Sequence, residues 1–381
     1  MDLMIIKNGL VMNEEFQLVS CDVRVEHGII TELGQTLSGE GVDAEGLYVL
    51  PGFIDTHIHG AYGVRISDEN GDLSRITKFE VTQGVTGLAI TTASSSFETL
   101  LSQLSSAAEF AKAAPGAKFL GIHAEGPFLS KDRRGAMNAD NIIDPDENKL
   151  DKMIEAAQGL LKLITIAPDT EEGRDLISYA VSRGLTVSMG HTDSHYDTAI
   201  LGMEAGATRA THTFNAMKGL HHREPNLVGA ALTEDGITCE MICDFVHLHP
   251  AVVKLIYRAK GADRICIISD SGHAAGIEIS EFEVDGIKRY VKDKVIRLAD
   301  GTIAGSAMTM LDGVQHLVKK LGLPLEDVSK MASFNPAKGM KLENETGSIG
   351  VGKKADLVLL DKELNVVSTY VDGVCVYQKE E

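Results

Sequence analysis

The chain has 381 residues, enough for one large or two unequal domains with a substantial buried core. Hydrophobic residues make up 44% and charged residues 24%, a balance typical of a folded globular protein and not of a disordered, collagen-like or coiled-coil chain. The 36 Lys and Arg residues against 55 Asp and Glu residues give a net charge of −19, which argues against nucleic acid and anionic membrane surfaces as partners.

Cysteine usage and the N-terminal residues predict a cytoplasmic protein. The five cysteines are odd in number and none belongs to a CxxC pair, so we expect free thiols in a reducing compartment. The first residues, MDLMIIKNGLVMNEEF, lack a basic region, and Lys7 and Asn8 interrupt their apolar run. We therefore expect neither a signal peptide nor a membrane span.

Both ends of the chain are predicted to form short strands. Residues 1–50 contain the runs LMIIK and CDVRVEHGIITEL, and the alternation on either side of His27 and Gly28 predicts a β-hairpin. The last residues return to this pattern in ADLVLLD, NVVSTYV and GVCVYQ. We therefore expect residues 1–50 and 343–381 to pair in one small β-sandwich domain.

The middle of the chain, residues 51–342, differs because short β-branched runs alternate there with stretches of helical period. The eight runs are YVLPGFIDTH (48–57), VTGLAITT (85–92), KFLGIHAEG (118–126), LKLITIAP (161–168), LTVSMGH (185–191), TRATHTFNA (208–216), ITCEMICDF (237–245) and DRICIISD (263–270). Helix candidates between them include SFETLLSQLSSAAEFAKAA, EEGRDLISYAVSRG and SHYDTAILGMEAG. Eight strand–helix units predict an α/β fold of the (β/α)8 TIM-barrel type. A doubly wound open sheet is the alternative, but no Gly-rich phosphate fingerprint follows the early strands.

Imidazole and carboxylate side chains stand at the carboxyl ends of these runs, where barrel enzymes build their active sites. His57 and His59 close the first run, and at a spacing of two on extended backbone both point to the same side. The other strand ends carry Glu125, His191, His212 and Asp270. Any one of these alone is more often a turn residue or a helix cap, so the prediction depends on their joint placement. Together they suit one or two divalent ions, with zinc, iron, manganese and cobalt as candidates.

Nine segments resemble the amidohydrolase superfamily and, within it, the family of deacetylases that act on N-acetylglucosamine 6-phosphate. They are PGFIDTHIHG (51–60), HAEGPFLS (123–130), GHTDS (190–194), THTFNAM (211–217), REPNLVGA (223–230), DFVHLHP (244–250), SDSGHAAG (269–276), GTIAGSAMTM (301–310) and GVGKKADLVLLD (350–361). The resemblance covers essentially the whole chain. It implies a metal-dependent hydrolase of a linear amide bond that acts on a phosphorylated amino sugar, with a barrel, a small β domain and usually a homodimeric assembly.

The resemblance also implies roles for individual residues. Glu125, His191 and His212 would hold the principal metal, and Asp270 would accept and return a proton beside it. His57 and His59 match positions that bind a second metal in some members, and Glu125 would bridge the two ions. Substrate contacts are implied at Ala136, Asn215, Ala216, Arg223, His247, Ile303, Ala304 and Gly305.

Two positions depart from the pattern of that family. Met137 stands where members often have a His that polarises the acetyl oxygen, and a thioether cannot donate a hydrogen bond. Phe245 is bulkier than the usual residue and is expected to reshape the sugar pocket. N-acetylgalactosamine 6-phosphate, or another acylated amine or cyclic amide, therefore stays open as a substrate. A catalytically inactive barrel that serves as an interaction protein is the alternative of a different class, and the intact ligand set argues against it.

Overall fold

Eight parallel strands form a barrel sheet in the order β15-β14-β13-β12-β11-β10-β9-β6 in the computed structural model, which describes residues 3–68, 71–92, 94–284 and 286–380. The strands are β6 (Phe53–Ile58), β9 (Val85–Thr92), β10 (Lys118–Glu125), β11 (Leu161–Ile166), β12 (Thr186–Met189), β13 (Arg209–Ala210), β14 (Thr238–Ile242) and β15 (Ile265–Ile268). An isolated parallel bridge between Ile58 and Ser271 nearly closes the sheet, and the amide of Asp270 donates to the carbonyl of His57 at 2.9 Å. The predicted (β/α)8 barrel is confirmed.

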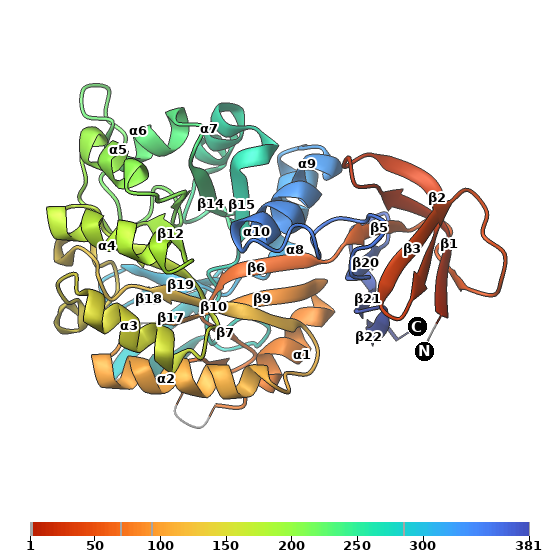
Figure 1. Ribbon diagram of the computed structural model, residues 1–381, viewed down its shortest axis with the longest axis horizontal. Coiled ribbons are helices and arrows are strands. Elements are labelled where there is room, and N and C mark those ends of the chain that lie inside the picture. Colours follow the sequence, from red (N-terminus) through yellow and green to blue (C-terminus); the bar gives the residue numbers. More distant parts are fainter. Residues whose placement is uncertain (1–2, 69–70, 93, 285, 381) are drawn as a thin grey trace.

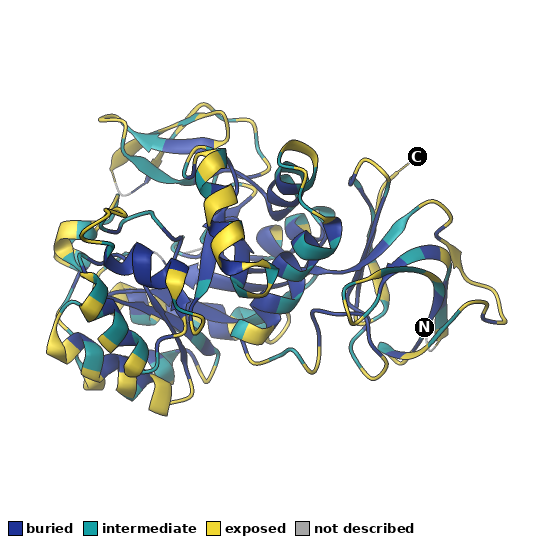
Figure 2. Ribbon diagram, turned by 90° about the horizontal axis from the view of Figure 1, so that it is seen from above, coloured by how far each residue is buried: buried dark blue, intermediate teal, exposed yellow. Residues whose placement is uncertain are grey.

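Helices cover the outside of the barrel, as Figure 1 shows. They are α1 (Ser74–Thr82), α2 (Phe97–Ala111), α3 (Glu147–Ala156), α4 (Glu171–Ser182), α5 (Tyr196–Glu204), α6 (Asn226–Thr233), α7 (Pro250–Lys260) and α8 (Met310–Gln315), followed by α9 (Leu325–Ser329) and α10 (Asn335–Gly339). Ser96 caps α2 by accepting from the amide of Thr99, and Asp146 caps α3 in the same way. Because helices lie outside and side chains fill the inside, a strand such as β9 is buried along its whole length. Figure 2 shows these buried strands beneath helices whose outer faces are exposed.

Both ends of the chain build a second, eight-stranded sheet. Its order is β22-β21-β20-β5-β1-β2-β3, with β4 paired to β1. The strands are β1 (Leu3–Met12), β2 (Leu18–Glu26), β3 (Ile29–Gly34), β4 (Val42–Asp43), β5 (Tyr48–Pro51), β20 (Leu357–Leu360), β21 (Val366–Val371) and β22 (Val374–Gln378). The sheet encloses a core of its own, in which Ile6 and Val23 pack with Leu357 and Leu359 from the other end of the chain. It lies beside the barrel with both termini (Figure 1), and its domain boundaries at 50 and 343 stay predictions.

The expected hairpin near the N-terminus is confirmed, whereas the first expected strand is divided. His27 and Gly28 join β2 to β3, both with positive φ. The run 48–57 separates at Gly52, where β5 pairs with β20 in the small sheet and β6 enters the barrel. A Cβ atom at Gly52 would lie 2.2 Å from the side chain of Thr86, so only glycine fits at this point, where the chain passes from the small sheet into the barrel.

A four-stranded antiparallel sheet follows β15 and was not anticipated from the sequence. It consists of β16 (Glu281–Val284), β17 (Ile287–Lys292), β18 (Val295–Leu298) and β19 (Ile303–Ser306). A short hairpin of β7 (Gly60–Ala61) and β8 (Val64–Arg65) follows β6. Within the described ranges, no helix is both long and apolar enough to cross a bilayer.

Candidate metal centre and active site

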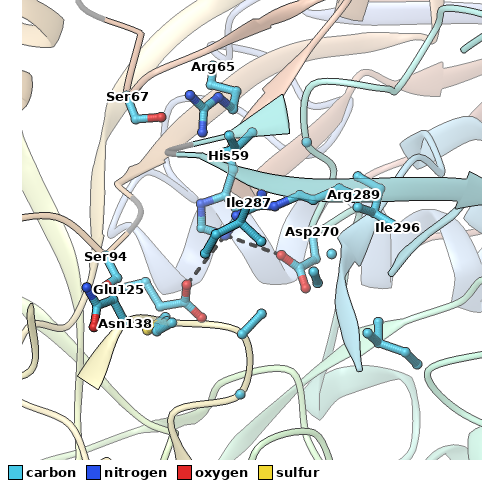
Figure 3. Close-up of a pocket in the computed structure, with 18 of the residues that line it drawn as sticks. His59, Arg65, Ser67, Ser94, Glu125, Asn138, Asp270, Ile287, Arg289 and Ile296 are labelled. Atoms are coloured by element: carbon cyan, nitrogen blue, oxygen red, sulfur yellow. Dashed lines mark ion pairs between the residues drawn. The ribbon is translucent and has the colours of Figure 1, made fainter. Parts of the chain in front are cut away.

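A cavity of about 640 Å³ opens at the carboxyl ends of the barrel strands. Its volume lies in the range of small-molecule sites. The lining includes His59, Glu125, His191, His212 and Asp270, which arrive from different strand ends. Figure 3 shows His59 between the carboxylates of Glu125 and Asp270. The structure thus brings the predicted ligand set together at the predicted end of the barrel.

Three donor atoms meet at the floor of this cavity. The Nε2 atoms of His191 and His212 lie 3.1 and 2.9 Å from Oε1 of Glu125, and 3.2 Å from each other. Ligands of a tetrahedral ion with bonds of about 2.0–2.1 Å are separated by roughly 3.3 Å, close to this spacing. The three atoms therefore have the arrangement of a partial coordination shell.

A second group of donors adjoins the first. His57 Nε2 lies 3.6 Å from Glu125 Oε1 and 3.7 Å from Asp270 Oδ1. His59 Nε2 lies 3.4 Å from Glu125 Oε2 and 3.3 Å from Asp270 Oδ1. Glu125 thus presents Oε1 to His191, His212 and His57 and Oε2 to His59, so its two oxygens reach both groups of donors, as a bridging carboxylate must.

The contacts of the Nδ1 atoms of His191 and His59 indicate that a cation fits among the Nε2 atoms and the carboxylates. Nδ1 of His191 lies 2.8 Å from the carbonyl of Arg133, and Nδ1 of His59 lies 3.2 Å from the carbonyl of Thr91. A carbonyl can only accept, so each Nδ1 carries a proton, and Nε2 is the nitrogen directed toward the carboxylates and free to hold a cation. A cation placed between these nitrogens and the carboxylate oxygens would satisfy both kinds of atom. The donor set therefore fits a divalent ion.

The charged groups of the site shift one another's pKa values. Burial lowers the pKa of His57, but the facing carboxylates, Glu125 foremost, raise it overall to about 10. Burial raises the pKa of Glu125, yet His57 and the other imidazoles hold it well below its usual range. The pKa of Asp270 is likewise lowered despite burial, because of its contact with the ring of His59 and its attraction to the ring of His57. Asp270 is therefore ionised at neutral pH, as a proton acceptor must be.

The backbone leaves the strands in an unusual conformation at three of these residues. The φ angles are 48° at His191, 29° at His212 and 47° at Asp270. Residues other than glycine rarely adopt this left-handed region, and each instance costs about 1–3 kcal/mol. Such strain persists where surrounding contacts impose it, and it clusters at functional sites.

Seven of the eight predicted substrate contacts line the cavity. These are Ala136, Asn215, Ala216, His247, Ile303, Ala304 and Gly305. Arg223 is exposed, lies 2.7 Å from the ring of His222, and is not among the lining residues described. Met137 does line the cavity. Phe245 was expected to reshape the sugar pocket, but it stacks on His316 instead, with ring centroids 5.0 Å apart, and is absent from the described lining.

A buried charged pair beneath the site was missed from the sequence. Arg209 on β13 donates to Oε1 of Glu240 on β14 at 2.9 Å, and the other oxygen of Glu240 lies 3.1 Å from Nδ1 of His57. Both side chains are almost wholly buried. The sequence could have indicated this pair, because Arg209 and Glu240 each lie inside a predicted strand, where a charged side chain needs a buried partner.

The sheet β16–β19 was also missed and forms one wall of the cavity. Phe282, Ile287, Arg289 and Ile296 line it from this sheet, and Figure 3 labels the last three. Phe282 also stacks on His273, with ring centroids 4.9 Å apart. The β-branched and aromatic residues of IKRYVK and VIRL, on either side of Asp293 and Lys294, are the signal that could have predicted these strands.

Comparisons with known proteins agree with this geometry. The amidohydrolase family profile matches residues 48–376. An N-acetylglucosamine-6-phosphate deacetylase of Lysinibacillus sphaericus is 34% identical over 375 residues, 97% of each chain. The enzyme of that name from Bacillus subtilis is 36% identical over 340 residues, 87% of this chain and 85% of the relative.

Solved structures show the same similarity. A Mycobacterium smegmatis N-acetylglucosamine-6-phosphate deacetylase mutant in complex with N-acetylglucosamine 6-phosphate has a TM-score of 0.93 at 30% identity, covering 99% of this chain and 100% of that one. A Thermotoga maritima deacetylase of the same name has a TM-score of 0.90 at 34% identity, with the same coverage. The profile and these relatives each span most of the chain, so this protein belongs to the amidohydrolase family.

Proposed function

We propose that the protein hydrolyses the N-acetyl group of N-acetylglucosamine 6-phosphate to give glucosamine 6-phosphate and acetate. The observation that carries this proposal is the convergence of the Nε2 atoms of His191 and His212 on Glu125, beside the ionised carboxylate of Asp270. The names and lengths of the relatives support the choice of substrate.

Glu125, His191 and His212 would hold the principal divalent ion, and His57 and His59 with Glu125 would hold a second one. Zinc is the first expectation, because imidazole and carboxylate donors at tetrahedral spacing suit it. A bound ion lowers the pKa of water toward 7 and polarises a carbonyl oxygen, which makes hydrolysis of an amide feasible at neutral pH.

Asp270 performs the proton transfers in this proposal. Its carboxylate accepts a proton from the attacking water as the new C–O bond forms at the acetyl carbon. The same group then returns that proton to the amine nitrogen as the C–N bond breaks, because an amine leaves readily only when protonated. Its main chain is held at both ends of the residue, since its amide donates to the carbonyl of His57 and its carbonyl accepts from the amide of Ser306.

His247 is the proposed phosphate contact within the cavity. Nδ1 of His247 lies 2.6 Å from Oδ2 of Asp244, and Oδ1 of Asp244 also accepts from the amide of His247 at 2.8 Å. Because these contacts fix the ring, Nε2 is the nitrogen left for substrate. Arg223 would add a second cationic contact with a planar fork for phosphate oxygens, provided that it reaches the cavity in the assembled enzyme.

The test is acetate release by the purified protein from a small panel of sugars, together with a metal assay. N-acetylglucosamine 6-phosphate should be turned over faster than the unphosphorylated sugar and faster than N-acetylgalactosamine 6-phosphate. The second comparison matters because an Escherichia coli N-acetylgalactosamine-6-phosphate deacetylase is 29% identical over 365 residues. Faster turnover of the galacto epimer would reassign the substrate. No acetate release from any amide would favour the inactive-barrel alternative.

Assembly and location complete the proposal. We expect a homodimer in the cytoplasm, with one or two divalent ions per chain and no nucleic-acid or membrane partner. Sedimentation or light scattering at working concentration tests the dimer, because a monomeric mass would contradict it.

A further inference from the structure

Glu240 lies beneath the metal centre and contacts two of its histidines. Its Oε2 atom lies 3.1 Å from Nδ1 of His57 and accepts from the main-chain amide of His212 at 3.2 Å. Its Oε1 atom accepts from Arg209 at 2.9 Å. The side chain of Glu240 is fully buried, so water does not compete for these contacts.

The contact of Glu240 with Nδ1 of His57 differs from the contacts that Nδ1 of His59 and Nδ1 of His191 make. His59 and His191 are held by the carbonyls of Thr91 and Arg133, which no side-chain substitution removes. Nδ1 of His57 is held by a carboxylate, and a carboxylate in this pairing can only accept. When an ion binds, the ring is neutral, so its one proton sits on Nδ1 and the lone pair of Nε2 is directed toward the ion beside Glu125.

Glu240 is not itself a ligand in this arrangement. His57, His123 and Glu240 have donor atoms close enough together to surround an ion. However, the ring nitrogens of His123 lie 3.1 Å from the carbonyl of Thr56 and 2.9 Å from the hydroxyl of Thr165. Both oxygens of Glu240 likewise face hydrogen-bond donors. His123 and Glu240 therefore do not bind an ion but hold the residues above them in place.

We propose that Glu240 is a positioning residue that fixes the tautomer of His57 and so creates the second metal site. Arg209 fixes the position of the Glu240 carboxylate, and the carboxylate in turn fixes the orientation of the His57 ring. This inference rests on the proposed metal-dependent function. It assigns a role to a carboxylate that would touch neither the ions nor the substrate.

Glu240→Gln tests the proposal with almost no change of shape. The glutamine amide has one oxygen and one NH2 group, and the buried guanidinium of Arg209 requires the oxygen. The NH2 group then faces Nδ1 of His57, which must become an acceptor and shift its proton to Nε2. It also faces the main-chain amide of His212, which loses its acceptor but keeps its ring in place beside Glu125. Nε2 of His57 loses its lone pair, so we expect the second ion to bind about 10–100-fold more weakly while the principal ion is retained.

The readout is zinc content per chain after equilibration with graded chelator, measured on wild type and variants. His57→Gln should lose the second ion, and adding Glu240→Gln to it should weaken zinc binding no further, because the two changes act through one ring. Asp356→Asn is the matched control, since this buried carboxylate pairs with Lys118 and Thr346 away from the metal centre, and it should keep the wild-type zinc content. A purely structural role for Glu240 would instead lower zinc binding further in the double variant.

A separate variant covers the case in which Glu240→Gln does not fold. Glu240→Asp keeps an acceptor, so it should retain two ions, and the loss of the second ion in that variant with normal folding would overturn the proposal. Wild-type zinc affinity at both sites in Glu240→Gln, equal loss of both ions, or a wild-type protein that binds only one ion would overturn it too. A wild-type protein with two ions that releases no acetate would refute the proposed substrate and leave the role of Glu240 standing.

Discussion

Asp270→Asn should abolish most turnover while leaving substrate binding and the content of the principal ion nearly intact. The side chain is almost wholly buried, and its Oδ1 atom lies 3.3 Å from Nε2 of His59. An asparagine has the same shape and can keep its oxygen facing the site, but it cannot accept and return a proton. General acid–base catalysis contributes about 10²–10⁴-fold, so kcat should fall by that factor, or roughly 3–5 kcal/mol of barrier.

The assay is acetate release under saturating N-acetylglucosamine 6-phosphate, with zinc content measured on the same samples. KM should change little, because the interaction lost is one made only in the transition state. Asp151→Asn is a suitable control, since that carboxylate pairs with Arg183 at 2.8 Å and neither residue is among the described lining of the cavity. A kcat within a few-fold of wild type in a fully metal-loaded Asp270→Asn protein would refute the assignment.

Three further predictions test the rest of the site. Glu125→Gln should remove zinc and activity together, because Glu125 contacts both proposed ion positions, and elemental analysis would detect zinc that stayed bound. His247→Ala should raise KM for the phosphorylated sugar more than for the free sugar, because it removes a contact to the phosphate. Arg223→Ala should do the same only if the guanidinium reaches the cavity in the assembled enzyme. Equal effects on KM for both sugars would exclude a phosphate contact by the residue that was changed. His57→Gln should slow turnover by weakening the second ion, and adding Met137→His should recover part of the loss by polarising the acetyl oxygen; no recovery in the double variant would show that position 137 does not reach it.

Much of the barrel could be predicted because its strands are short, β-branched and bounded by turns. The run VTGLAITT corresponds to β9 over its whole length. The first run was predicted as one strand because nothing in YVLPGFIDTH shows that its two halves join different sheets. That division depends on the close approach of Thr86 to Gly52, a contact between distant parts of the sequence. The local sequence pattern therefore predicts where strands lie better than it predicts which strands pair with one another.

The site could be predicted where residues follow strand ends, and could not where the contact crosses the barrel. His191 and His212 stand at the ends of their runs, which is enough to place them at one face. Glu240 lies within β14, and its pairing with Arg209 and His57 joins residues 31 and 183 positions away. The charge of such a residue shows that it needs a buried partner, but only the folded chain shows which one.

The arrangement that makes the site reactive also costs the fold stability, and an ion should offset that cost. His191, His212 and Asp270 adopt left-handed φ angles at about 1–3 kcal/mol each, and they turn lone pairs and carboxylates toward one another. An ion that binds only the folded chain adds about 4 kcal/mol of stability at a thousand times its Kd. At roughly 2 °C per kcal/mol for a chain of this size, removing zinc with a chelator should lower Tm by roughly 8 °C in calorimetry. Glu125→Gln should show a much smaller chelator effect, because its ligand set is already broken. An unchanged wild-type Tm after complete removal of zinc would mean that the site is rigid without the ion and that its strain is sustained by the barrel alone.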